Sequence, residues 1–273
     1  MKRVVTALIL APVVLSLVFW GPKWLIALTV AAVAVLAGWE FIGLAERCAA
    51  RPPRVAVVVA ILALFWGNYE WPDQTAALFG ALSLGLLVYC TFHSPRERML
   101  ADAASSVFGF FYVGLTLIAL PMLREQANGP ALVVFLLCVV WCGDIAAMYV
   151  GRAWGRHKLA PTLSPNKTWE GAVGSVAGSV AVTGLLLWLG AQLSQWNYAK
   201  LSFSDEVWWY WLVLAVVVNV AAQVGDLAES ALKRSAGVKD SGTLLPGHGG
   251  VLDRIDALLL AAPLLWYAQG IRY

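Results

Sequence analysis

Long apolar runs recur along this chain of 273 residues, and their length restricts the fold more than any other feature. Each run approaches the ~20 residues that a helix needs to cross a bilayer. Only 13% of the residues are charged, whereas about 25% is usual in soluble domains. The mean hydropathy is +0.74. These values exclude an ordinary soluble domain and predict a polytopic membrane protein.

The fold class that we expect is all-α, a polytopic integral membrane helical bundle with about nine transmembrane helices. In hydrocarbon only helices and closed barrels satisfy the backbone, and continuous apolar runs lack the alternation of a barrel. The predicted spans are 4–20, 24–45, 54–67, 75–92, 106–123, 131–150, 171–194, 207–228 and 251–269. We expect a single integral membrane domain over residues 1–273, with N-terminal spans in 1–130 and a catalytic part in 131–273.

The basic residues predict the orientation, because cytoplasmic loops carry the excess of Lys and Arg. With nine spans, fifteen of the 19 Lys and Arg residues fall on one side and four on the other. This count predicts that the N-terminus is inside and the C-terminus outside. The membrane that we expect is a bacterial-type inner (plasma) membrane. The first run is expected to be a retained span, with a cleaved signal peptide as the alternative. Tryptophans are expected to form a belt at the outer span ends: Trp20, Trp24, Trp66, Trp71, Trp196, Trp208, Trp209, Trp211 and Trp266.

Three acidic residues lie inside apolar runs: Glu40, Asp144 and Asp226. A carboxylate in a span costs about 2.5–3.5 kcal/mol even on the lenient insertion scale, so it usually faces a bundle interior or a cavity. Each of the three is therefore a candidate site residue.

Helical spacing groups further charges near the last two spans. Asp226, Glu229 and Lys233 stand at i, i+3 and i+7, which aligns them on one face if the helix continues to Lys233. Asp253 and Asp256 share a face at i, i+3. Carboxylates near lysines suit Mg²⁺, which takes its remaining oxygens from water and substrate phosphates. The alternative is a solvated helix end held by a Glu229–Lys233 pair.

Two polar segments, 151–170 and 229–250, are expected to be cytoplasmic loops. In the first, residues 164–170 are predicted to cap the following helix, which leaves Lys167 unexplained by capping and makes it a functional candidate. In the second, the glycine-rich turn 245–250 allows backbone N–H groups to approach phosphate oxygens. A plain connector is the alternative for this turn, and a structural hydrogen bond is the alternative for His248.

The residues from 230 to 256 carry a pattern that resembles a known signature. The pattern reads Ser230-x-Leu-Lys-Arg-x4-Lys239-Asp240-x-Gly-x2-Leu-Pro-x-His-Gly-Gly-x2-Asp253-Arg-Ile-Asp256. It resembles that of the phosphatidate cytidylyltransferase family, also called CDP-diacylglycerol synthases, with every constrained position filled. Segment 164–171 and the helices with Asp144 and Asp226 are similar to that family too.

The resemblance implies that CTP and phosphatidic acid react to give CDP-diacylglycerol and pyrophosphate, with Mg²⁺ and an open number of cations. It implies metal ligands among Asp226, Asp253, Asp256 and Asp144. It implies catalytic roles for Asp226, Lys233, Arg234, Lys239 and Asp253. It implies substrate binding by Lys167, Ser164, Ser230, Asp240, Gly247, His248, Gly249, Gly250 and Arg254.

Two other functions remain open at this stage. A CTP-dependent kinase of a membrane lipid alcohol needs the same phosphate clamp. An ion-coupled transporter would use the intramembrane carboxylates, although no inverted repeat supports it. A CDP-alcohol phosphotransferase is disfavoured because its Asp-x2-Asp-Gly-x2-Ala-Arg pattern is absent. The expected partners are CTP, phosphatidic acid and membrane lipids, with no nucleic acid at a net charge of +3 and a homodimer left open.

Overall fold

The computed structural model describes residues 2–195, 201, 203, 207–244 and 249–270, and the side chains from residue 11 onward within those ranges. The chain forms two compact units. Unit 1 contains residues 1–22, 122–230 and 260–273, and unit 2 contains residues 23–121 and 231–259. Residues 231–259, which hold most of the signature, therefore belong to the same unit as residues 23–121. The expected division at residue 130 stays a prediction.

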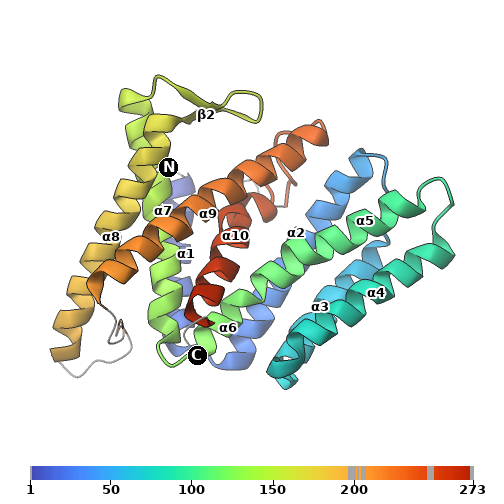
Figure 1. The fold of residues 1–273 in the computed structure, drawn as a ribbon, viewed down its shortest axis with the longest axis horizontal. Coiled ribbons are helices and arrows are strands. Elements are labelled where there is room, and N and C mark those ends of the chain that lie inside the picture. Colours follow the sequence, from blue (N-terminus) through green and yellow to red (C-terminus); the bar gives the residue numbers. More distant parts are fainter. Residues whose placement is uncertain (1, 196–200, 202, 204–206, 245–248, 271–273) are drawn as a thin grey trace. The chain divides into compact units, whose positions relative to one another are not determined.

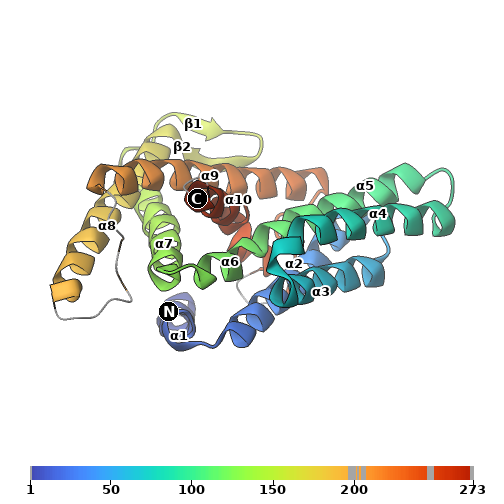
Figure 2. The ribbon, with the colours of Figure 1, turned by 60° about the horizontal axis from the view of Figure 1, so that its bottom comes forward.

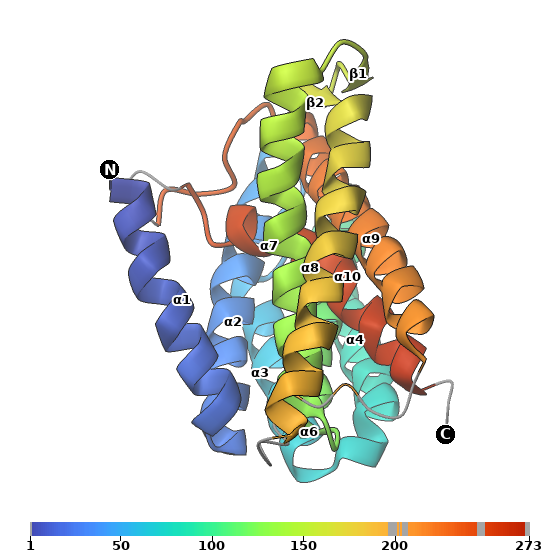
Figure 3. The same ribbon diagram turned by 90° about the vertical axis from the view of Figure 1, so that its left-hand side faces the viewer.

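Unit 1 consists of long apolar helices and a polar hairpin. Helices α7 (Gly129–Trp154) and α8 (Trp169–Gln195) run side by side, and the hairpin of β1 (Lys158–Ala160) and β2 (Ser164–Thr168) lies at one end of the pair (Figures 1 and 3). The unit also holds α1 (Lys2–Trp20), most of α6 (Ala119–Glu125) and of α9 (Trp208–Ser235), and the end of α10 (Leu252–Gly270).

Unit 2 is a bundle of the N-terminal helices. Helices α2 (Lys23–Arg47), α3 (Arg54–Glu70), α4 (Thr75–His93) and α5 (Met99–Gly109) pack against one another (Figure 2), with the turn η1 (Pro72–Gln74) between α3 and α4. A π-helical turn, η2 (Phe110–Leu115), continues α5. Phe41 of α2 packs against this region, with its ring centroid 6.0 Å from that of Tyr112. The unit also contains residues 231–259, which form the C-terminal end of α9 and the N-terminal part of α10.

The expectation of an all-α polytopic membrane protein is confirmed. Among the described residues, six helices are long and apolar enough to cross a membrane, and Ala11–Trp20 is a shorter apolar helix. The six are Lys23–Arg47, Pro72–His93, Met99–Arg124, Gly129–Trp154, Trp169–Gln195 and Trp208–Ser235. The expected number of about nine spans stays a prediction.

Three expectations about local structure need correction. Residues 229–235 are the last turns of α9 rather than a loop, because the sequence has no glycine or proline there to end the helix. Segment 151–170 contains the end of α7 and the β-hairpin. Trp211 is not part of an interfacial belt, because it is fully buried and its ring centroid lies 5.4 Å from that of Phe135.

Small residues set the close approach of α7, α8 and α9 in unit 1. A Cβ added at Gly143 of α7 would meet the amide nitrogen of Asn219 and lie 2.7 Å from Ser179 Oγ. A Cβ at Gly178 would lie 2.5 Å from the methyl group of Ala146. Membrane helices associate through such close backbone contacts, because lipid supplies no hydrophobic drive between helices.

We expect Gly143→Ala to destabilise unit 1 by about 1–3 kcal/mol, since the added methyl group has no room beside Asn219 and Ser179. Thermal unfolding in detergent would show a lower midpoint. Gly184→Ala on α8 is the matched control, because a Cβ there meets no atom within 4 Å. Equal midpoints for the two variants would contradict the packing argument.

Candidate functional site

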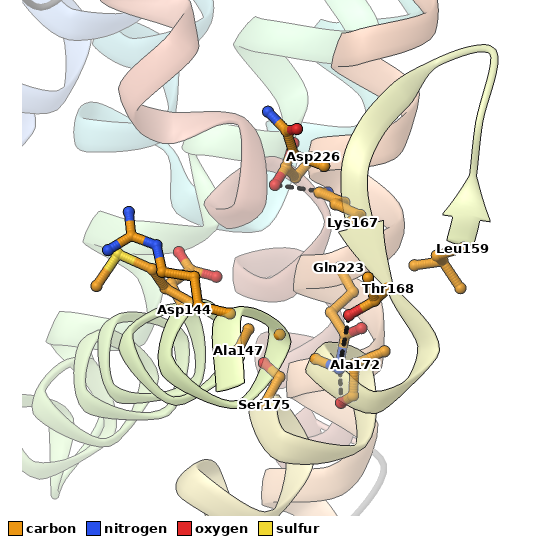
Figure 4. Close-up of a pocket in the computed structure, with 14 residues that line it drawn as sticks. Asp144, Ala147, Leu159, Lys167, Thr168, Ala172, Ser175, Gln223 and Asp226 are labelled. Carbon is orange, nitrogen blue, oxygen red and sulfur yellow. Dashed lines mark hydrogen bonds and ion pairs between the residues drawn. The ribbon is translucent and has the colours of Figure 1, made fainter. Parts of the chain in front are cut away.

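A cavity of about 520 Å³ with charged residues in its lining opens among α7, α8, α9 and the hairpin of unit 1 (Figure 4). Its polar lining includes two of the intramembrane carboxylates, Asp144 of α7 and Asp226 of α9. Lys167 of β2 also lines it. These three residues, which are up to 82 positions apart in the sequence, therefore share one cavity. Its volume lies within the range of small-molecule sites.

Lys167 and Asp226 form an ion pair at the cavity wall. The distance from Lys167 Nζ to Asp226 Oδ2 is 2.6 Å (Figure 4). The exposed fractions are 26% for the lysine side chain and 35% for the aspartate, so both remain accessible to a ligand. Ser230 Oγ stands 3.5 Å from Asp226 Oδ1, one turn further along α9. Arg152 of α7 also lines the cavity, so the arrangement presents two basic side chains and carboxylate oxygens to the same space.

The hairpin holds Lys167 in place. Its strands pair antiparallel, with Lys158 opposite Thr168 and Ala160 opposite Ser164. Thr168 Oγ1 accepts the backbone N–H of Gly171 at 3.1 Å, so Thr168 caps the start of α8. Capping was expected within residues 164–170, and the structure assigns it to Thr168.

Glu170, in the first turn of α8, binds the residues that precede β1 of the hairpin. Its carboxylate accepts the backbone N–H of Arg156 at 3.1 Å and bonds His157 Nδ1 at 2.6 Å. The hairpin that carries Lys167 is thus tied to α8 at both of its ends. A short strand is a more precise support than a free loop, because its backbone is fixed by pairing.

Sequence reasoning missed a buried amide network behind the cavity. Asn219 Nδ2 donates to Ser175 Oγ at 2.9 Å and to Ser179 Oγ at 2.8 Å. Gln223 Nε2 donates to Asn219 Oδ1 at 2.7 Å, and Gln223 and Ser175 both line the cavity. A signal was present, because Asn219 and Gln223 precede Asp226 by seven and three residues and so share its helix face.

A second cluster of predicted residues lies in unit 2 around Asp253, in the first turn of α10. Lys233 Nζ stands 2.6 Å from Asp253 Oδ1. The other oxygen, Oδ2, accepts the N–H of Ser241 at 3.0 Å and that of Gly250 at 2.7 Å. The side chains of Lys233 and Asp253 are only 12% and 8% exposed. This aspartate is therefore held by charge and by the backbone of the signature segment.

Glu40 belongs to the same cluster. It is 8% exposed, in keeping with its expected position in a bundle interior or cavity. Its Oε1 accepts the N–H of Val251 at 3.0 Å, and its Oε2 accepts that of Leu252 at 2.8 Å. The partners of Glu40 are therefore the residues that begin α10.

The remaining predicted residues have varied surroundings. Arg234 donates to the carbonyl oxygen of Val238 at 3.0 Å. Asp256 is half-buried one turn after Asp253, and Gly249 has a positive φ of 79° that suits glycine. Lys239, Asp240 and Arg254 are exposed, and Ser164 is half-buried at the start of β2. Gly247 and His248 lie outside the described residues.

The donor set of the cavity fits Mg²⁺. Magnesium is usually held by one or two carboxylates, with the rest of its octahedron filled by water and phosphate oxygens. Asp144 and Asp226 supply two carboxylates to one cavity. Within the described ranges no three His, Cys, Asp or Glu side chains gather as a metal site. A magnesium ion here would therefore depend on substrate oxygens.

These features define a class, a polytopic membrane protein whose charged cavity suits phosphate groups. The sequence model of the cytidylyltransferase family matches residues 1–271. The chain belongs to this family.

Two curated relatives illustrate the similarity, and both are named phosphatidate cytidylyltransferase. The one from Pseudomonas aeruginosa is 36% identical over 280 residues, which cover 98% of this chain and 97% of the relative. The one from Brucella suis biovar 1 is 47% identical over 164 residues, which cover 60% of this chain. That second match spans 56% of the Brucella protein's own length.

Proposed function

We propose that this protein transfers the cytidylyl group of CTP to phosphatidic acid and releases pyrophosphate. The observation that carries the proposal is the Lys167–Asp226 ion pair in a cavity among apolar helices. In such a cavity, charged side chains can bind phosphate groups close to the lipid bilayer. Family membership and the name of the Pseudomonas relative support the same reaction. They favour it over the kinase and transporter alternatives.

The reaction needs no nucleophile from the enzyme. A phosphate oxygen of phosphatidic acid attacks the α-phosphorus of CTP, and a new P–O bond forms. The bond between the α-phosphorus and the oxygen that bridges to the β-phosphorus breaks, and pyrophosphate leaves. Catalysis of such transfers rests on in-line positioning and on neutralising charge. These are tasks for fixed cations and for the shape of the pocket.

The chain's basic residues are assigned to these tasks. Lys167 would neutralise phosphate charge in the cavity, and its hairpin keeps its Nζ at a fixed place. Lys233, Arg234 and Lys239 of the signature would compensate the triphosphate and the lipid phosphate. Further substrate contacts are proposed for Ser164, Ser230, Asp240, Gly247, His248, Gly249, Gly250 and Arg254.

Magnesium is part of the proposal. Asp226 and Asp253 are the proposed principal ligands, with Asp144 and Asp256 in support. When bound, Mg²⁺ would withdraw charge from phosphate oxygens and stabilise the leaving pyrophosphate. Asp144 and Asp226 are suited to this because both line the cavity. Asp253 would have to exchange its contact with Lys233, which lies 2.6 Å away.

The proposed setting is the bacterial-type inner (plasma) membrane, with the N-terminus and the active groups in the cytoplasm and the C-terminus outside. The excess of fifteen Lys and Arg over four on alternate sides supports this orientation. It also suits the substrates, because CTP is cytoplasmic while the acyl chains of phosphatidic acid remain in the bilayer.

A direct assay tests the function. Purified full-length protein is incubated with α-labelled CTP, phosphatidic acid and Mg²⁺, and we expect labelled CDP-diacylglycerol and free pyrophosphate. Excess EDTA is expected to abolish product, and added Mg²⁺ to restore it, since the carboxylates alone add negative charge to the cavity. A folded, lipid-supplied sample that makes no CDP-diacylglycerol would overturn the proposal. A phosphorylated lipid with CDP as product would point to the kinase instead.

A further inference from the structure

We propose that Glu40, on α2, is a positioning residue for Asp253, an inference that rests on the proposed function for its catalytic consequence. Glu40 fixes the backbone at the start of α10, and that backbone in turn holds the Asp253 carboxylate. Both residues lie in unit 2. Glu40 lies outside the signature segment and precedes Asp253 by more than 200 residues.

Three consecutive backbone amides donate hydrogen bonds, one to the carboxylate of Asp253 and two to that of Glu40. Gly250 N–H donates to Asp253 Oδ2 at 2.7 Å. The next two, Val251 and Leu252, donate to Glu40 at 3.0 and 2.8 Å. Movement of this turn away from Glu40 would therefore also move the donor that orients Asp253.

Ser241 joins the two carboxylates directly. Its Oγ lies 3.1 Å from Glu40 Oε2 and 3.0 Å from Asp253 Oδ2. A hydroxyl carries one proton, so it can donate fully to only one carboxylate at a time. The position of Ser241 therefore depends on both acids, and its backbone N–H also donates to Asp253 at 3.0 Å.

The site requires a carboxylate at position 40. The first amides of a helix lack partners within the helix, and the helix dipole favours negative charge there. From a different helix, Glu40 accepts the amide of Leu252, the first residue of α10, and that of Val251 just before it. These donors also offset the free-energy cost of burying the Glu40 carboxylate, since Glu40 is only 8% exposed within an apolar helix.

Two glycines show how closely the segment approaches Glu40. A Cβ added at Gly242 would lie 2.5 Å from Glu40 Oε1. A Cβ added at Gly250 would overlap both Glu40 Oε2 and Ser241 Oγ. Residues without side chains thus allow the backbone to close around the carboxylate from two points of the signature. The contact is built from several positions rather than from one hydrogen bond.

The test uses Glu40→Gln in the full-length protein, with Glu46→Gln as the matched control. Glu46 lies on the same helix and pairs with Arg54, with the Glu46 side chain 35% exposed. In Glu40→Gln an amide NH₂ replaces one acceptor. We expect kcat to fall about 10- to 100-fold, with KM for CTP and for phosphatidic acid within about threefold. Glu46→Gln should retain the wild-type kcat.

A second readout separates this inference from the proposed reaction. Hydrogen exchange of the amides of Gly250, Val251 and Leu252 is expected to be at least about tenfold faster in Glu40→Gln than in wild type or Glu46→Gln. If wild-type protein makes no CDP-diacylglycerol, the proposed function fails, and the exchange still decides the positioning role. Unchanged exchange, or an unchanged kcat in an active enzyme, would overturn it. If Glu40→Gln does not fold, Glu40→Asp provides the measurement, because it keeps the charge and shortens the reach.

Discussion

Replacement of Lys167 with Met is expected to lower kcat for CDP-diacylglycerol formation about 10³-fold. Lys167 is the cation that the hairpin holds in the cavity, 2.6 Å from Asp226 Oδ2. The methionine side chain keeps much of the volume but removes the charge. Two effects then combine: the phosphates lose a compensating cation, and Asp226 loses its ion pair at the cavity wall.

The matched control is Lys158→Met. Lys158 lies on the partner strand of the same hairpin, opposite Thr168 in the register, and it is exposed. The control removes the same charge from the same local structure, and its kcat should stay within about twofold of wild type. Initial rates in mixed micelles, with CTP and phosphatidic acid varied separately, provide the measurement. Similar rates for the two variants would show that general positive charge, rather than Lys167, matters.

The second large effect is expected for Asp253→Asn, at about 10²-fold in kcat. Asp253 accepts from Lys233 on one oxygen and from Ser241 and Gly250 on the other. An asparagine presents one NH₂ group, and either orientation of the amide points it at an existing donor. The substitution therefore removes a charge beside a buried lysine and also weakens the hold on the signature segment.

Asp73→Asn in η1 is the control for this variant, because Asp73 is an exposed acid of the same unit. The comparison should include a Mg²⁺ titration, since loss of a metal ligand raises the Mg²⁺ concentration needed for half-maximal rate. Near-normal turnover by a folded Asp253→Asn protein would remove Asp253 from the catalytic set. A lower kcat with an unchanged Mg²⁺ dependence would support charge neutralisation and argue against metal binding by this residue.

Much of the fold followed from local pattern, because crossing a bilayer is a property of each apolar run by itself. The helical elements of the structure overlap every predicted span, and the largest differences concern polar segments. Residues 229–235 continue α9, and residues 158–168 pair as a hairpin. Hydropathy identifies segments that enter lipid, whereas it does not determine whether a polar segment continues a helix or pairs as strands.

The sequence predicted which residues form the candidate site, but not the cavity that some of them share. Asp144, Lys167 and Asp226 were each candidates on their own, but their common cavity depends on how α7, α8, α9 and β2 pack. Trp211 illustrates the same limit: its position at a span end suggested the membrane interface, and packing against Phe135 buries it. A periodic pattern specifies which face of a helix is polar, and only tertiary contacts specify what that face meets.

Glu40 shows what the sequence could predict and what depended on the tertiary structure. The sequence by itself placed this acid in an apolar run, where such a charge needs partners, and it predicted phosphate chemistry for residues 230–256. Only the tertiary structure decided that the partners are Val251 and Leu252, 211 and 212 residues away. The physical reason is that a hydrogen bond requires two atoms to lie within about 3 Å, and that distance is set by helix packing rather than by position in the chain.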